Sequence, residues 1–234
     1  MNWLDWLGAF VSNPAHRTGP DSPQQRIAEH LAFSGQALLS AAVLAIPLGL
    51  LIGYTGRGTL LVTALTGVAR ALPTLGLVTL TVLLAGVGDT AVLIPLVALA
   101  APQLLVTAAE GIRSTDPQVR DAALGIGLTH RQVLLTVCLP SAAPIVLAGL
   151  RTAAVQVIAT ATVAAYVGLG GLGRYVIDGL ATRDYPTTVG GALLVVLLAV
   201  ATQLFFTLLI RYTLPAGIRA QVPGTAFTTF KDPT

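Results

Sequence analysis

The chain has 234 residues, of which 54% are hydrophobic and only 10% are charged, and its formal net charge is +3. Water-soluble domains carry about 25% charged residues, so this composition excludes an ordinary soluble domain and indicates a protein of the lipid bilayer. The basic residues form no run and no patch interleaved with aromatic residues, which excludes a nucleic-acid-binding surface. The single cysteine, Cys138, excludes an internal disulfide, and the three histidines show no metal-ligand spacing.

Residues 1–30 precede the first long apolar stretch. Asp5 interrupts the first turn, which is not the pattern of a secretory signal peptide. The stretch NWLDWLGAF is typical either of a short interfacial helix, with Trp3, Trp6 and Phe10 at the depth of the lipid headgroups, or of a partly ordered tail.

Five stretches are apolar enough to cross a membrane as helices, which takes about 20 residues each. They cover residues 31–56, 59–85, 90–109, 141–167 and 187–210. The sequence therefore predicts an all-α, polytopic membrane protein whose transmembrane domain covers residues 31–212. A polar loop at 110–140 separates the third span from the fourth, and a proline-rich tail occupies residues 213–234.

Basic residues predict the orientation of the spans, because Lys and Arg gather in cytoplasmic loops. Five spans place the two termini on opposite sides of the membrane. With the C-terminus inside, the inner segments hold seven basic residues: Arg57, Arg113, Arg120, Arg131, Arg211, Arg219 and Lys231. The outer segments then hold four: Arg17, Arg26, Arg174 and Arg183. We therefore expect the N-terminus outside, the C-terminus in the cytoplasm, and the 110–140 loop on the cytoplasmic side.

The 110–140 loop contains the pattern of a first short helix. Asp116 and Pro117 favour a helix start, because Asp accepts hydrogen bonds from the first N–H groups and Pro suits the first helical position. Apolar residues then recur at i, i+3, i+4 and i+7 and form one stripe: Val119, Ala122, Ala123 and Ile126. Gly127 fits the left-handed position that often ends a helix.

A second short helix is predicted directly after Gly127. Thr129 and Gln132 have the spacing of a capping box. We expect this helix to end at Leu139-Pro140, because proline discourages continuation. Such an element is too short and too polar to span a membrane, so its apolar stripe docks on its own bundle, on the lipid surface or on a partner.

The residues of this loop resemble the coupling-loop motif of ABC importer permeases, which reads Glu-Ala-Ala, Gly and Ile-x-Leu-Pro at the same spacings. The chain has Asp121-Ala122-Ala123, Gly127 and Val137-x-Leu139-Pro140, so it departs from the motif in Asp for Glu and Val for Ile. The resemblance implies the type I ABC importer fold with a cytoplasmic coupling helix that docks on an ATP-hydrolysing subunit. It implies a docking role for Asp121, Ala122, Ala123, Gly127, Leu139 and Pro140.

Further stretches are similar to one subgroup of these permeases, which imports osmoprotectants: glycine betaine, choline, carnitine and proline-type compounds. They are AIPLGLLIGY, RALPTLGL (70–77), AGLRTAAVQVIATATVAAYVGLGGLG (148–173) and IDGLATRDY (177–185). The resemblance implies a pore in a bacterial inner membrane that works by alternating access. The implied partners are ATP-binding cassette subunits, a second permease chain of the same or a homologous sequence, an extracytoplasmic substrate-binding protein and membrane lipid.

No Gly-x-x-x-x-Gly-Lys-Ser/Thr motif occurs in the chain. We therefore expect no enzymatic activity and no cofactor in this subunit, with ATP and magnesium bound by the partner. Aromatic residues are only 6% of the chain, so an aromatic cage for a quaternary ammonium is expected on the separate binding protein.

Two positions within the second span have open interpretations. Arg70 either lies on the translocation pathway or gate, or it extends to the interface or pairs with an acid of a partner subunit. Pro73, which lies within the predicted span, kinks the helix and shapes either the pathway or only the packing.

Polar residues and glycines of the fourth span and the following loop are further candidates. Gln156, Thr160 and Thr162 either line a pathway or form hydrogen bonds between helices. For Gly170 and Gly171, in VGLGGLG (167–173), the resemblance implies an outer gate that faces the binding protein, and the alternative is a tight re-entrant turn.

Two other functions remain open. One is an ABC permease for methionine or another small solute. The other, a secondary transporter, predicts acidic residues within the membrane for ion coupling, and the predicted spans offer none apart from Asp89 at a turn.

Overall fold

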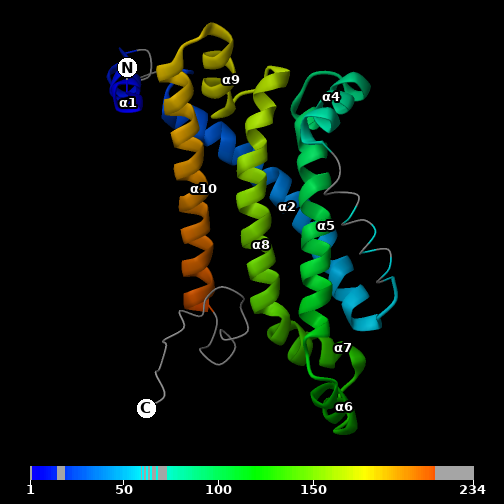
Figure 1. The fold of residues 1–234 in the computed structure, drawn as a ribbon. Helices are drawn as coiled ribbons and strands as arrows, with labels where there is room; N and C mark the ends of the chain where they lie inside the picture. Colours follow the sequence, from blue (N-terminus) through cyan, green and yellow to red (C-terminus); the bar gives the residue numbers. More distant parts are fainter. Residues whose placement is uncertain are drawn as a thin grey trace, which may run out of the picture.

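Three long helices stand side by side and a fourth crosses behind them (Figure 1). This computed structural model describes residues 2–14, 19–58, 60, 62, 64, 67 and 73–213. The described part of the chain is helical and contains no strand, which confirms the all-α prediction.

The helices follow one another along the chain with short connections. They are α1 (Trp3–Ser12), α2 (Pro23–Thr55), α4 (Thr74–Ala85), α5 (Asp89–Arg113), α6 (Pro117–Gly125), α7 (His130–Gln132), α8 (Leu139–Ala161), α9 (Gly173–Thr182) and α10 (Tyr185–Thr213). A π-helical segment, Val133–Cys138, joins α7 to α8, and a 3-10 segment, Thr162–Val167, follows α8.

Among the described residues, four segments are long and apolar enough to cross a membrane: Pro23–Thr55, Asp89–Arg113, His130–Val167 and Tyr185–Thr213. The prediction of five spans is therefore met only in part. Helix α4 lies in the predicted second span, 59–85, but has 12 residues. Much of residues 59–72, including Arg70, lies outside the described residues.

The prediction that a helix ends at Leu139-Pro140 is wrong, because the helical segment runs on from His130 to Val167. Pro140 lies in the first turn of α8, directly after the π-helical segment. The changed hydrogen-bond register of a π-helix is one way in which a helix accommodates a missing N–H donor. The Ser141 hydroxyl donates to the carbonyl of Val137 at 2.8 Å, so a side chain also supplies a donor in this region.

Helices α2 and α5 approach each other backbone to backbone. The buried side of α2 is a row of small residues three or four apart: Ser34, Ala37, Ala41, Ala45, Gly49 and Gly53. A Cβ at Gly49 would lie 2.5 Å from the carbonyl oxygen of Leu105, and a Cβ at Gly53 would lie 2.5 Å from that of Ala109. Close approach at small residues is a main source of helix association in membranes.

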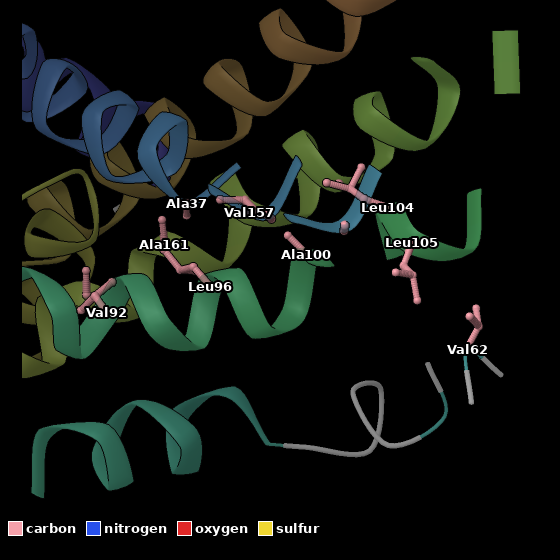
Figure 2. Close-up of a cluster of buried hydrophobic side chains, with 13 residues drawn as sticks. Ala37, Val62, Val92, Leu96, Ala100, Leu104, Leu105, Val157 and Ala161 are labelled. Atoms are coloured by element: carbon pink, nitrogen blue, oxygen red, sulfur yellow. The ribbon is translucent and has the colours of Figure 1, made fainter. Parts of the chain in front are cut away.

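The largest apolar cluster joins α2, α5 and α8 (Figure 2). Its buried members include Ala37, Ala41, Val92, Leu96, Ala100, Leu104, Val157 and Ala161. This core lies along the middle of the long helices. The shorter helices lie at the ends, with α1, α4 and α9 at one end and α6 and α7 at the other (Figure 1).

Helix α1 packs on α10 and α9 through its aromatic residues. The rings of Trp6 and Tyr185 stack with centroids 5.5 Å apart, and Phe10 meets Tyr175 edge to face at 5.5 Å. A Cβ at Gly190 would overlap the Phe10 ring, so this glycine makes room for it. Residues Trp3–Ser12 therefore form an ordered helix, and Phe10 is buried by protein rather than by lipid headgroups.

Candidate functional site

The first helix of the 110–140 loop begins as its sequence predicts. The Asp116 side chain accepts a hydrogen bond from the backbone N–H of Gln118 at 2.8 Å, and Pro117 is the first residue of α6. The start of α6 is therefore set by residues next to it in the sequence.

The apolar stripe of α6 is divided between two environments. Ala123 is 7% exposed and packs with Ile112, Val133 and other residues at the foot of the bundle. Val119 is 50% exposed and Ile126 is 81% exposed. The two large side chains of the stripe, Val119 and Ile126, therefore do not dock on the chain's own helix bundle.

Gly127 ends α6 in a left-handed conformation, as predicted, with φ +93°. Its N–H donates to the carbonyl of Leu124 at 2.9 Å, and the N–H of Leu128 donates to the carbonyl of Ala123 at 3.2 Å. These two bonds make a Schellman motif. A Cβ at Gly127 would meet no atom within 4 Å, so the constraint is on backbone conformation and not on space.

The second helix begins with the predicted capping box. The N–H of Gln132 donates to the Thr129 hydroxyl at 3.3 Å, and the N–H of Thr129 donates to the Gln132 side chain at 2.8 Å. Leu139 is half-buried and Pro140 is exposed, and both lie in the first turn of α8 rather than in a loop. Asp121 and Ala122 are exposed on α6.

One residue of α2 contacts both short helices of the loop. The Arg120 guanidinium lies 4.6 Å from the centre of the Tyr54 ring, and its Nη2 donates to the Tyr54 carbonyl at 3.4 Å. The Tyr54 hydroxyl lies 2.9 Å from Nδ1 of His130. The sequence analysis missed these contacts, since no spacing relates position 54 to positions 120 and 130.

At the opposite end, the glycine-rich loop rests on charged residues of α2. The N–H of Gly171, whose φ is +88°, donates to the Glu29 carboxylate at 2.8 Å. A Cβ at Gly170 would overlap Glu29, so both glycines allow the loop to lie against this side chain. Arg26 pairs with Glu29 at 3.0 Å and with Asp21 at 2.5 Å.

Two further contacts hold this end together. The buried His30 places Nε2 2.9 Å from the carbonyl oxygen of Ile158 in α8. The Tyr175 hydroxyl donates to the carbonyl of Asp21, and burial raises the pKa of Tyr175 to about 12. The sequence analysis set residues 1–30 apart from the transmembrane domain, as a tail or a short interfacial helix, and so missed their part in this arrangement.

Gln156 and Thr160 lie along one side of α8, and Thr162 begins the 3-10 segment that follows it. Gln156 is exposed and Thr160 is half-buried, four residues apart, and the exposed Thr152 precedes them by another four. The Thr160 hydroxyl donates to the Gln156 carbonyl at 2.7 Å, and the Thr162 hydroxyl donates to the Ala159 carbonyl at 2.9 Å. The threonines thus bond to their own helix rather than to a neighbouring one.

Of the two remaining candidates, Pro73 lies within the described residues. Pro73 is the residue that precedes the first turn of α4, so it starts a helix and does not kink one, contrary to the prediction. Arg70 lies outside the described residues. Within the described part of the chain, no three His, Cys, Asp or Glu side chains are placed to hold a metal ion.

Comparisons with known proteins extend over most of the chain. A family model described as "Binding-protein-dependent transport system inner membrane component" matches residues 45–216. The choline transport system permease protein OpuBB of Bacillus subtilis is 30% identical, over 82% of this chain and 88% of its own. The carnitine transport permease protein OpuCB of Listeria monocytogenes is 30% identical, over 84% of this chain and 90% of its own.

A solved structure has the same fold. An inward-facing conformation of the MetNI methionine ABC transporter superposes with a TM-score of 0.68, over 80% of this chain and 94% of that chain. Its sequence identity is 21%, so this likeness concerns the arrangement of the helices.

Proposed function

Because the chain belongs to the family of inner membrane components of binding-protein-dependent transport systems, we propose that it is the permease subunit of an ATP-driven osmoprotectant importer. Its cargo would be choline, glycine betaine, carnitine and proline-type compounds. The observation that carries this proposal is the similarity to permeases named for choline and carnitine transport, which covers more than four fifths of the chain. The methionine transporter shares the fold only and does not support methionine as the cargo.

The 110–140 loop is the proposed contact with the ATP-binding subunit. Asp121 and Ala122 lie on the exposed side of α6, next to the uncovered Val119 and Ile126, and offer an apolar surface with one carboxylate. Ala123 anchors α6 from the inside, and Gly127 sets the turn that presents it. Leu139 and Pro140 connect the loop to α8, so that movement of the ATP-binding subunit reaches a membrane span directly.

The exposed polar side of α8 is the proposed pathway. Gln156 offers an amide, and the hydroxyls of Thr160 and Thr162 already bond to the backbone. Such a surface contacts a zwitterion or a quaternary amine weakly, which suits a path that must release its cargo. In this scheme a second permease chain covers the same face from the other side, and a separate binding protein supplies tight recognition.

The end that holds α1 and α9 is the proposed extracytoplasmic side. The bias of basic residues toward the 110–140 loop and the C-terminal tail supports this orientation. The loop with Gly170 and Gly171 then faces the binding protein as an outer gate, held on Glu29. Binding of ATP closes the ATP-binding subunits, the 110–140 loop moves with them, and the pore opens toward the binding protein.

The test is uptake of labelled glycine betaine by membrane vesicles that contain this subunit with its co-purified partners, with and without ATP. We expect saturable, ATP-dependent uptake that choline and carnitine reduce by competition and methionine does not. Uptake of methionine instead would contradict the cargo and keep the ATP-driven importer. Uptake that is indifferent to ATP would contradict the importer itself and favour a secondary transporter.

A further inference from the structure

The backbone connects the 110–140 loop to only two of the long helices. Helix α5 enters the loop at Arg113, and α8 leaves it without a break after the π-helical segment. Helix α2 ends at Thr55, far earlier in the sequence, so only side-chain contacts relate it to the loop. The polar contacts among them converge on Tyr54.

On the basis of the proposed function, we propose that Tyr54 is a positioning residue that transmits movement of the 110–140 loop to α2. We call Tyr54, Arg120 and His130 the Tyr54 junction. Arg120 belongs to α6 and His130 begins α7, so the junction holds the two helices on either side of the Gly127 turn. A shift of either helix acts on the same residue of α2.

The contacts of the junction have defined directions. The guanidinium covers one face of the Tyr54 ring and reaches the Tyr54 carbonyl, while the phenol oxygen meets the imidazole. Other contacts between α2 and the loop are apolar, with Leu50 beside the cluster of Ile112 and Val133. The polar contacts depend on direction, because a hydrogen bond weakens steeply when its angle becomes unfavourable. The junction therefore fixes the register between the loop and α2.

Helix α2 packs closely on α5 next to the Tyr54 junction. Gly53, directly before Tyr54, and Gly49, one turn earlier than Gly53, lie against the backbone of α5. Because no side chain separates the two helices there, a movement that reaches α2 at Tyr54 also reaches α5. The junction thus gives the loop a direct contact with the α2–α5 pair, in addition to the backbone connection at Arg113.

The test uses the assembled complex in vesicles and measures ATP hydrolysis and glycine betaine uptake on the same sample. Tyr54→Phe removes the hydroxyl and keeps the ring, and Arg120→Gln removes the cation. We expect each variant to lower uptake per ATP hydrolysed about fivefold, the size of one lost hydrogen bond. Poor folding would lower the amount of complex but not this ratio.

Two comparisons sharpen the result. In a double-mutant cycle, Tyr54→Phe with His130→Ala should lose no more than either single variant, because both remove one interaction. Tyr212→Phe is the matched control, since Tyr212 is exposed near the end of α10 and should keep the wild-type ratio. Wild-type ratios in Tyr54→Phe and Arg120→Gln would overturn the proposal.

A second measurement does not depend on the cargo. Hydrogen–deuterium exchange of the complex is compared with and without ATP and vanadate. We expect the nucleotide to change exchange in both the loop and the last turn of α2, residues 51–56, in the wild type. In Tyr54→Leu the change at residues 51–56 should be clearly smaller, because only the path through α5 remains. An equal change at residues 51–56 in both proteins would overturn the proposal, even if the cargo proved to be something other than glycine betaine.

Discussion

The Glu29 carboxylate accepts the backbone N–H of Gly171 at 2.8 Å, and the two residues are 142 positions apart. This bond holds the glycine-rich loop on α2, and Arg26 of the same helix forms an ion pair with the Glu29 carboxylate. Glu29→Ala leaves both donors without this acceptor, so we expect it to lower the free energy of unfolding by about 1–3 kcal/mol. Glu29→Gln keeps an acceptor and should lose less.

Thermal unfolding of the purified chain in detergent measures this effect. Glu110→Ala is the control, because Glu110 is exposed at the other end of the bundle. Equal unfolding temperatures for wild type and Glu29→Ala would show that the loop does not depend on Glu29.

The Gly127 turn offers a matched pair of substitutions in one loop. Gly125 and Gly127 both have open space at Cβ, but only Gly127 has a positive φ. Alanine at Gly127 costs about 1–2 kcal/mol of left-handed strain, whereas alanine at Gly125 favours the helix. We expect Gly127→Ala to lower ATP-dependent uptake several-fold, with a larger loss for Gly127→Val, while Gly125→Ala stays near wild type. Full uptake by Gly127→Val would mean that this turn is not needed for coupling.

Helix α2 contains a second matched pair. A Cβ at Gly53 would press on the backbone of α5, whereas a Cβ at Gly35 meets nothing within 4 Å. Gly53→Ala should therefore destabilise the chain by about 1–3 kcal/mol through overpacking. Gly35→Ala should be neutral or stabilising by up to about 1 kcal/mol, because alanine is the better helix former. The unfolding temperatures of the two variants, measured under the same conditions, test this difference. An equal change in unfolding temperature in both variants would contradict the close packing of α2 on α5.

Burial keeps the Tyr175 hydroxyl protonated, with its pKa raised from 10.0 to about 12. The folded state therefore holds this proton more tightly than the unfolded state. The resulting stabilisation is complete below about pH 10 and is lost as the pH rises toward 12. Absorbance titration of the tyrosines should show one residue that ionises near pH 12 and disappears in Tyr175→Phe. If Tyr175 ionised over the same pH range as the exposed tyrosines, its hydroxyl would be in contact with water and the prediction would be wrong.

Local signals predicted the 110–140 loop well. The hydrogen bonds that begin and end its helices join residues close together in the sequence, at Asp116, Gly127 and Thr129. A short stretch of sequence is therefore enough to predict them. The same reasoning failed at Pro140, because it assumed α-helical hydrogen bonding on both sides of the proline. The π-helical segment changes that bonding, and no sequence pattern used here marks it.

Contacts between distant residues were not predictable from one sequence. Neither the bond from Gly171 to Glu29 nor the Tyr54 junction has a periodicity or a motif, since each depends on how α2 lies against later helices. The stripe of α6 was recognised, but its period alone could not show that Ala123 faces inward while Ile126 stays uncovered. Composition and the coupling-loop resemblance, by contrast, were sufficient for the all-α membrane fold and the family.

The π-helical segment also determines the direction in which the 110–140 loop points around the axis of α8. Helix α7, Val133–Cys138 and α8 form one continuous rod, so the direction in which the loop points around that rod depends on the number of residues between them. One residue corresponds to a rotation of about 100° in an α-helix. An inserted or deleted residue there would turn Gly127 and α6 to another direction while the side of α8 with Gln156 stayed in place. The segment thus sets the angle between the proposed contact with the ATP-binding subunit and the proposed pathway.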